Sequence, residues 1–98
     1  MLFMILCHDG PDGADLRQTH RPAHLDYIKS AGDRVKVAGP ILSDDAEPHP
    51  VGSMILIDAG SLTAAHLFAE NDPYRTAGVF ERVEVWPWKP VIGGWLNG

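Results

Sequence analysis

The chain has 98 residues, a formal charge of −5 and a hydrophobic fraction of 45%. This length suits one compact domain, and no run approaches the roughly 20 apolar residues of a membrane span. The eight lysines and arginines are scattered, which argues against nucleic acid and against an anionic membrane surface as partners. We expect one domain over residues 1–98, located in the cytoplasm, because the apolar start "MLFMILC" lacks the features of a signal peptide.

The first half of the chain predicts a strand, a helix and a second strand. The apolar run Leu2–Cys7 leads into the turn sequence "HDGPDG". We expect the helix to begin near Pro22, because proline is best tolerated in a first turn, with Asp12–His20 as a loop or a separate turn. The helix should end at Gly32, which suits a left-handed position. Arg34–Gly39 alternates, as a strand with one buried face does.

The second half predicts a strand, a helix and a last strand. A polar, proline-rich loop over residues 40–52 leads to the apolar strand Ser53–Ile57. Ser61 is a suitable N-cap for the helix that follows. One face of this helix is apolar: Leu62, Ala65, Phe68 and Ala69. Residues 72–78 are expected to form a loop with at most one helical turn, and Val79–Trp86 alternates again.

The order β-α-β-β-α-β predicts a ferredoxin-like α+β fold with an antiparallel sheet. In this topology the first and third strands are central, and here these two are uniformly apolar, whereas the second and fourth alternate. Both helices cover one face, so the other face needs a second cover. We expect a homodimer that packs sheet on sheet, with the tail, including Trp86, Trp88 and Trp95, wrapping the other subunit. A monomer with this tail folded over its own sheet is the alternative.

His24 is the first candidate for chemistry. In a helix that begins near Pro22, His24 occupies the first turn and shares a stripe with Ile28 and Ala31. Because Ile28 must face the core, His24 should lie at the rim of the buried stripe, near the positive end of the helix. A half-buried imidazole there suits general acid–base chemistry near neutral pH. A core-edge histidine bonded to a backbone carbonyl is the alternative.

Other ionisable groups surround His24 in the sequence. His20 and His24 form an H-x-x-x-H pair, but Pro22 lies between them and no third ligand is evident, so we expect no metal. Arg21 is a candidate for binding an anionic group of a substrate. Arg17 is a second candidate for this role, although for Arg17 we favour a solvated charge.

Outside this segment the sequence offers fewer candidates. Asp72 precedes a proline, which is a normal helix start with the carboxylate as N-cap. Tyr74 either packs or lines a pocket with its hydroxyl. Cys7 lies in an apolar run and is expected to be a buried thiol. No partner is apparent for His8, His49 or His66.

Three segments resemble the YciI-like, or YCII-related, proteins. These are "RPAHLDYI" (Arg21–Ile28), "AGPIL" (Ala38–Leu42) and "ENDPYRTAGVFERVEVWPW" (Glu70–Trp88). Each motif is short, but their order and spacing along almost the whole chain are fairly specific. The sequence departs from the family pattern at "LSDDAEPHP" and in its tryptophan-rich tail, so the identity of the substrate does not carry over.

The resemblance implies a dimeric α+β barrel whose site is built around a His–Asp pair. Carried over by motif, the pair is His24 and Asp72, and Gly39, Pro40 and Tyr74 fall at positions that line the pocket. The family includes a dehydrochlorinase that acts on a chlorinated hydroxyquinol, and it is similar to muconolactone isomerases.

The resemblance and the residues together favour a cofactor-independent lyase or isomerase acting on a small organic molecule. In this hypothesis His24 is the general acid or base, Asp72 orients it and Arg21 holds an anionic group. No glycine-rich phosphate loop suggests a nucleotide cofactor. The alternative is a non-catalytic dimeric module that binds a small ligand or serves as an accessory protein.

Overall fold

The predicted order of elements is present in the computed structural model, which describes residues 1–96. The last two residues of the expected domain and of its tail lie outside the described residues. The elements are β1 (Leu2–Asp9), α1 (Gly13–Ser30), a 3-10 turn (Gly32–Arg34), β2 (Val35–Leu42), β3 (Pro50–Asp58), α2 (Leu62–Glu70), α3 (Pro73–Thr76) and β4 (Phe80–Pro87). Each strand ends one to three residues later than predicted, and β2 and β4 also begin one residue later.

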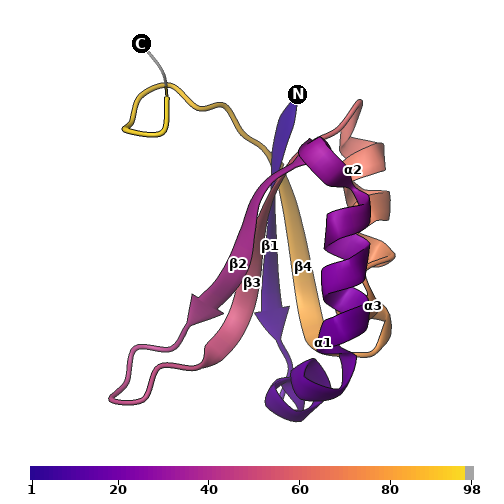
Figure 1. Ribbon diagram of the computed structural model, residues 1–98, viewed down its shortest axis with the longest axis vertical. Coiled ribbons are helices and arrows are strands. Elements are labelled where there is room, and N and C mark those ends of the chain that lie inside the picture. Colours follow the sequence, from indigo (N-terminus) through magenta and orange to yellow (C-terminus); the bar gives the residue numbers. More distant parts are fainter. Residues whose placement is uncertain (97–98) are drawn as a thin grey trace.

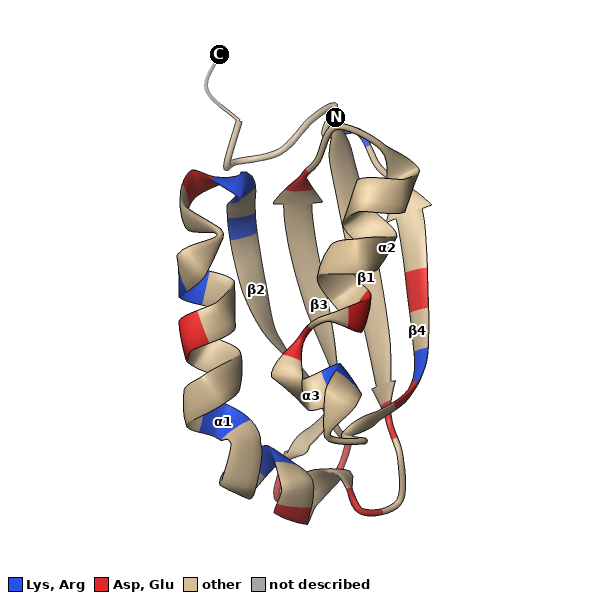
Figure 2. Cartoon of the chain, turned by 90° about the vertical axis from the view of Figure 1, so that its right-hand side faces the viewer, with Lys and Arg blue, Asp and Glu red and all other residues tan. Residues whose placement is uncertain are grey.

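The four strands form one antiparallel sheet in the order β2-β3-β1-β4. The first and third strands are therefore central, and the predicted ferredoxin-like α+β class is confirmed. Figures 1 and 2 show all three α-helices on one face of the sheet, with α1 toward β2 and α2 in front of the central strands. Within the described chain, no helix combines the length and apolar character needed to cross a membrane.

The core lies between the sheet and the helices. Alternate residues of β1 point into it, and Phe3, Ile5 and Cys7 are buried. The predicted apolar face of α2 is buried at Ala65, Phe68 and Ala69. Leu62, at the first position of α2, is exposed instead, so the inward face of α2 begins one turn later than expected.

Helix α1 differs from the expectation because it begins at Gly13 and passes through Pro22. A proline inside a helix removes one backbone hydrogen bond and typically costs about 3 kcal/mol. Contacts made upstream of the proline offset this cost: Leu16 packs against the core, and Arg17 pairs with Asp9. Gly13 permits this start, because a Cβ there would lie 2.8 Å from atoms of the Asp9 side chain.

The residues predicted to end the first helix and to cap the second lie where the sequence indicates. Gly32 follows α1 with a positive φ of 59°. The Ala64 amide donates to the Ser61 hydroxyl at 3.1 Å, so Ser61 caps α2. At Gly52, where β3 approaches β1, a Cβ would clash with the Cys7 carbonyl oxygen. A side chain at position 52 would therefore force the two central strands apart.

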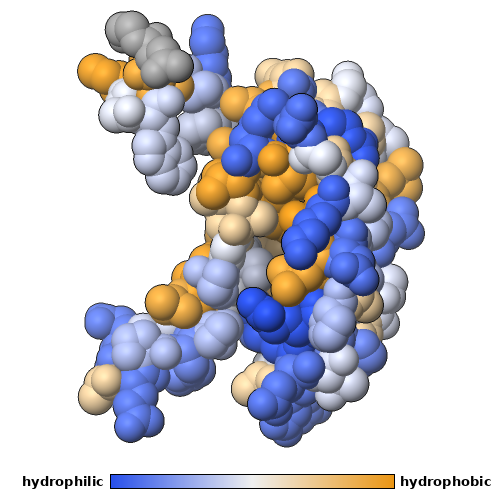
Figure 3. All heavy atoms as spheres, viewed as in Figure 1, coloured by the Kyte–Doolittle hydropathy of each residue, from blue (hydrophilic) through white to orange (hydrophobic). Residues whose placement is uncertain are grey.

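The sheet face opposite the helices, here called the open sheet face, carries apolar side chains that are only partly buried. Its central members are Leu2, Met4, Leu6, Met54 and Leu56. In Figure 1 the loop between β2 and β3 and the tail after β4 both project beyond this face, and Figure 3 shows a hollow with hydrophobic residues between the two projections. Trp88 and Trp95 are exposed, so the tail does not fold over the sheet of its own chain.

Candidate functional site

An open cleft of about 790 Å³ lies between α1 and the strands β2 and β3. Five residues that the sequence or the resemblance singled out line it: Arg21, His24, Gly39, Pro40 and Tyr74. Gly39 and Pro40 belong to β2, on the side of the cleft opposite α1. Two residues that were not expected there, Arg17 and Ser53, line it as well. The cleft therefore brings five of the predicted site residues together, and Asp72 contacts one of them, His24, from outside the lining.

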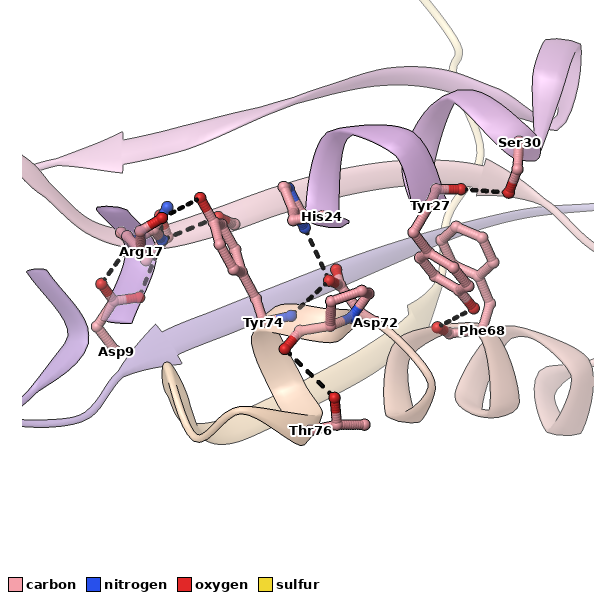
Figure 4. A network of polar contacts seen from close by, with 12 residues as sticks. Asp9, Arg17, His24, Tyr27, Ser30, Phe68, Asp72, Tyr74 and Thr76 are labelled. Carbon is pink, nitrogen blue, oxygen red and sulfur yellow. Dashed lines mark hydrogen bonds and ion pairs between the residues drawn. The ribbon is translucent and has the colours of Figure 1, made fainter. Parts of the chain in front are cut away.

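His24 and Asp72 are in direct contact (Figure 4). The distance from His24 Nδ1 to Asp72 Oδ1 is 2.7 Å, and the side chains are only 12% and 2% exposed. When Asp72 is ionised, its carboxylate can only accept a hydrogen bond, and Nδ1 is then the atom that donates the hydrogen. In the neutral ring this leaves the lone pair on Nε2. The pair thus has the arrangement in which a carboxylate fixes an imidazole for acid–base chemistry.

Asp72 also caps the short helix α3. Its Oδ1 accepts the backbone N–H of Tyr74 at 2.9 Å. The cap and the contact with His24 were alternatives at the level of sequence, but one oxygen makes both. The other oxygen, Oδ2, is buried and has no hydrogen-bond partner among the described residues. The backbone of α3 therefore fixes the carboxylate, and the carboxylate fixes His24.

Tyr74 supports the imidazole from a second direction. The rings of His24 and Tyr74 stack with centroids 3.9 Å apart and planes 4° apart. Tyr74 donates its hydroxyl to the backbone carbonyl of Arg17 at 3.2 Å, and burial raises the pKa of that hydroxyl. Tyr74 thus presents its ring to the site, while its hydroxyl holds the backbone of α1.

The position of His24 in its helix differs from the expectation. Because α1 begins at Gly13, His24 lies about three turns inside the helix rather than at its positive end. The helix-end charge falls off within the first turn, so it does not act on this ring. The continuous helix also places His20 one turn before His24, although no group of three or more potential metal ligands occurs in the part of the chain described.

Arg17 was expected to be a solvated charge, and this expectation is wrong. Its Nε and Nη2 donate to the two carboxylate oxygens of Asp9 at 2.7 and 2.9 Å. Nη2 also contacts the Gly52 carbonyl at 2.7 Å and the Ser53 hydroxyl at 3.0 Å. The Arg17 and Asp9 side chains are 11% and 8% exposed. The pair joins α1 to the end of β1 at one end of the cleft (Figure 4).

Arg21 differs from Arg17 in its surroundings. It is exposed on the next turn of α1 and lies at the edge of the cleft. Figure 2 shows the basic residues of α1 spaced along the helix. Lys29 lines the cleft on the same helix, and Asp15 is an acidic residue among the lining.

Comparison with known proteins identifies the family. A family model described as the YCII-related domain matches residues 1–89. The chain belongs to the YCII-related family. It is 38% identical to Protein YciI of Escherichia coli O6:H1, over 94% of this chain and all of that protein. An uncharacterised protein of Haemophilus influenzae is 35% identical over the same shares.

A solved structure shares the fold of this YCII-related chain. It is 5-chloro-2-hydroxyhydroquinone dehydrochlorinase (TftG) from Burkholderia phenoliruptrix AC1100, in complex with 2,5-dihydroxybenzoquinone. The TM-score is 0.83 at 34% identity, and the match covers 91% of this chain and 94% of the other. The predicted family and the predicted fold class are thus both confirmed.

Two histidines of the YCII-related chain have partners that the sequence did not indicate. His8 Nε2 lies 2.8 Å from Glu84 Oε2, and this hydrogen bond is the main cause that lowers the pKa of Glu84. Arg82 lies 3.2 Å from the same histidine nitrogen. His49 lies 3.0 Å from the hydroxyl of Ser43. The sequence did not indicate these partners, because each lies across a strand pair or a loop, whereas His49 is exposed as expected.

Cys7 is buried, as predicted, and its environment suppresses the thiolate. Burial, followed by the negative charge of Asp72, raises the pKa of Cys7 from 9.0 to about 12. At pH 8 the thiolate fraction should be about 1,000-fold lower than in the unfolded chain. We expect iodoacetamide to modify the native protein at least that much more slowly than the protein in urea, as measured by mass spectrometry. Equal rates in both states would contradict the burial of this thiol.

Proposed function

We propose that this YCII-related protein is a cofactor-independent enzyme of the lyase or isomerase type, in which His24 and Asp72 perform general acid–base chemistry on a small organic molecule. The observation that carries the proposal is the 2.7 Å contact between the two side chains at a cleft large enough for such a molecule. The single cysteine is a buried free thiol, which fits the cytoplasmic location that we also propose.

The chemistry begins at His24 Nε2. This nitrogen takes a proton from a carbon next to a carbonyl group, and the electron pair of the broken C–H bond moves toward the carbonyl oxygen to give an enolate. In an elimination, the enolate electrons then form a double bond as a leaving group departs with its bonding pair. In an isomerisation, the imidazolium returns the proton to a different carbon. Asp72 stabilises the imidazolium in both reactions.

The related dehydrochlorinase indicates the class of molecule. That enzyme is named for elimination from a chlorinated hydroxyhydroquinone, and its structure holds 2,5-dihydroxybenzoquinone. We propose that this chain also takes a planar, oxygenated ring or a compound of similar size. Arg21, exposed at the edge of the cleft, would meet an anionic group of this substrate.

Deuterium exchange tests the proposal on several classes of compound at once. A panel of hydroxyquinones, lactones and enolisable ketones is incubated with the protein in D₂O, and incorporation of deuterium at carbon is followed by NMR. We expect catalysed exchange with the wild type and its loss with His24→Asn. His66→Asn, which alters an exposed histidine on α2, is the matched control and should retain exchange. Exchange that persists in His24→Asn, or saturable binding without exchange, would favour the non-catalytic module.

We further propose that the protein functions as a homodimer that buries the open sheet face. The central strands contribute Met4, Leu6, Met54 and Leu56 to this face, where they are only partly buried. Apolar faces of this kind usually mark interfaces. The two projections on either side of the hollow (Figure 3) would contact the second subunit.

Leu6→Glu should disrupt this dimer. The substitution buries a carboxylate from each subunit at the interface, where like charges cost several kcal/mol, so the dimer dissociation constant should rise about 100-fold or more. Analytical ultracentrifugation over a concentration series measures this change. Leu67→Glu, at an exposed position of α2, is the matched control and should leave the association unchanged. A wild type that remains monomeric at high concentration would refute the dimer.

A further inference from the structure

Two polar side chains that the proposed acid–base pair does not use, Arg17 and Ser53, meet at the cleft. They come from α1 and β3, and both line the same cleft as His24. Ser53 is only 4% exposed, and its oxygen accepts a hydrogen bond from Arg17 Nη2 at 3.0 Å. Buried polar groups normally have at least one hydrogen-bond partner, and among the described residues this contact gives Ser53 a partner while its own hydroxyl hydrogen stays free to donate to a ligand.

Each of the two side chains retains donor hydrogens. The Ser53 hydroxyl accepts from Arg17, and its own hydrogen has no acceptor among the described residues. In Arg17, Nε and Nη2 are occupied by Asp9, Gly52 and Ser53, whereas Nη1 makes no hydrogen bond within the described chain. One hydroxyl hydrogen and the two hydrogens of Nη1 are thus available to a ligand oxygen.

The donors are held rigidly. Both carboxylate oxygens of Asp9 accept hydrogen bonds from the guanidinium of Arg17. The Cζ of Arg17 lies 5.2 Å from the centroid of the Tyr74 ring. Preorganised donors of this kind stabilise negative charge that develops in a reaction, because they need no rearrangement.

The donors also lie near the acid–base pair. Arg17 and His24 both contact the ring of Tyr74, so the two groups lie within the span of a small planar molecule. A planar substrate that spans the cleft would place its carbonyl oxygen at Arg17 and Ser53 and a carbon conjugated with that carbonyl at His24. When His24 removes a proton from this carbon, negative charge develops on the oxygen, and the donors of Arg17 and Ser53 stabilise it.

We propose that Arg17 and Ser53 form an oxyanion subsite that binds the carbonyl oxygen of the substrate and stabilises the enolate formed when His24 removes a proton. The assignment rests on the proposed acid–base function and restricts its substrates to enolisable carbonyl compounds, quinones included. It makes Ser53 a residue that contacts the substrate and Asp9 a residue that positions Arg17.

Binding of 2,5-dihydroxybenzoquinone tests the subsite. This molecule carries enolic and carbonyl oxygens on one planar ring, and isothermal titration calorimetry gives its dissociation constant. Ser53→Ala removes the hydroxyl while Asp9 and Gly52 still hold Arg17, so it avoids the folding defect expected of an Arg17 variant. A lost hydrogen bond to a charged group should raise the dissociation constant about 10-fold or more.

Two controls make the result specific. Ser30→Ala removes an exposed hydroxyl whose one hydrogen bond in the described part of the chain is to the Tyr27 carbonyl, and it should bind the quinone like the wild type. Arg21→Gln should weaken binding less than Ser53→Ala does. Wild-type affinity in Ser53→Ala, or no binding of the quinone to the wild type, would overturn the subsite. The proposed acid–base function fails separately, when His24→Asn retains deuterium exchange.

Discussion

Asp72→Asn should lower the rate of catalysed deuterium exchange by about 10²- to 10⁴-fold while the protein remains folded. Asparagine keeps an oxygen that can accept the Tyr74 N–H bond observed at 2.9 Å, so α3 retains its cap. It lacks the negative charge that stabilises the imidazolium after His24 has taken a proton. The lower exchange rate would therefore result from the missing negative charge and not from a displaced His24 or a lost cap.

Asp12→Asn is a matched control for this substitution. Asp12 occupies the N-cap position of α1, and its side chain makes no capping hydrogen bond. The exchange rate should stay within about twofold of the wild type. The unfolding free energy of Asp72→Asn, measured by urea denaturation, identifies any loss of activity caused by unfolding. An exchange rate near that of the wild type in folded Asp72→Asn would show that the charge of Asp72 has no part in catalysis.

Asp9→Ala should lower the unfolding free energy by about 3–5 kcal/mol, because it leaves the buried charge of Arg17 without a partner. The Arg17 and Asp9 side chains are 11% and 8% exposed, so water replaces the lost carboxylate poorly. Urea denaturation monitored by tryptophan fluorescence measures the change. The double variant Asp9→Ala with Arg17→Met should recover part of the loss, since no unpaired charge remains.

The Arg75–Glu70 pair provides the comparison. It spans 3.3 Å, and the Glu70 carboxylate is largely exposed. Exposed pairs contribute about 0–1 kcal/mol, so Glu70→Ala should change the unfolding free energy by no more than that. Equal effects of Asp9→Ala and Glu70→Ala would show that the Asp9–Arg17 pair is not buried in solution.

The order of elements could be predicted because strand alternation and turn residues act locally. Ser61 and Gly32 behave as their residue types indicate, at a cap and at a positive φ. The start of α1 could not be predicted in the same way. The rule that places proline in a first turn is local, whereas the contacts that extend α1 upstream of Pro22 join Arg17 to Asp9 of another element.

In the candidate site, too, the features set by local sequence could be predicted, whereas those set by contacts between distant elements could not. His24 was a candidate because it shares the apolar stripe of its helix, and the family motifs paired it with Asp72, although the sequence alone could not show that the two side chains touch. Arg17 and Ser53 were missed because their partners come from different elements and become neighbours only in the folded chain. The spacing of Asp9 and Arg17 would have been a signal only if α1 had been expected to begin at Gly13.

The state of the His24 ring tests most directly whether Asp72 prepares Nε2 for proton transfer. Nitrogen-15 NMR of the labelled protein, with His24→Asn to assign the signals, reports which ring nitrogen carries the hydrogen in the neutral form. We predict that Nδ1 carries it, donated to Asp72, and that Nε2 is unprotonated. A neutral ring with its hydrogen on Nε2 would contradict this mechanism, because that nitrogen could not then act as the base.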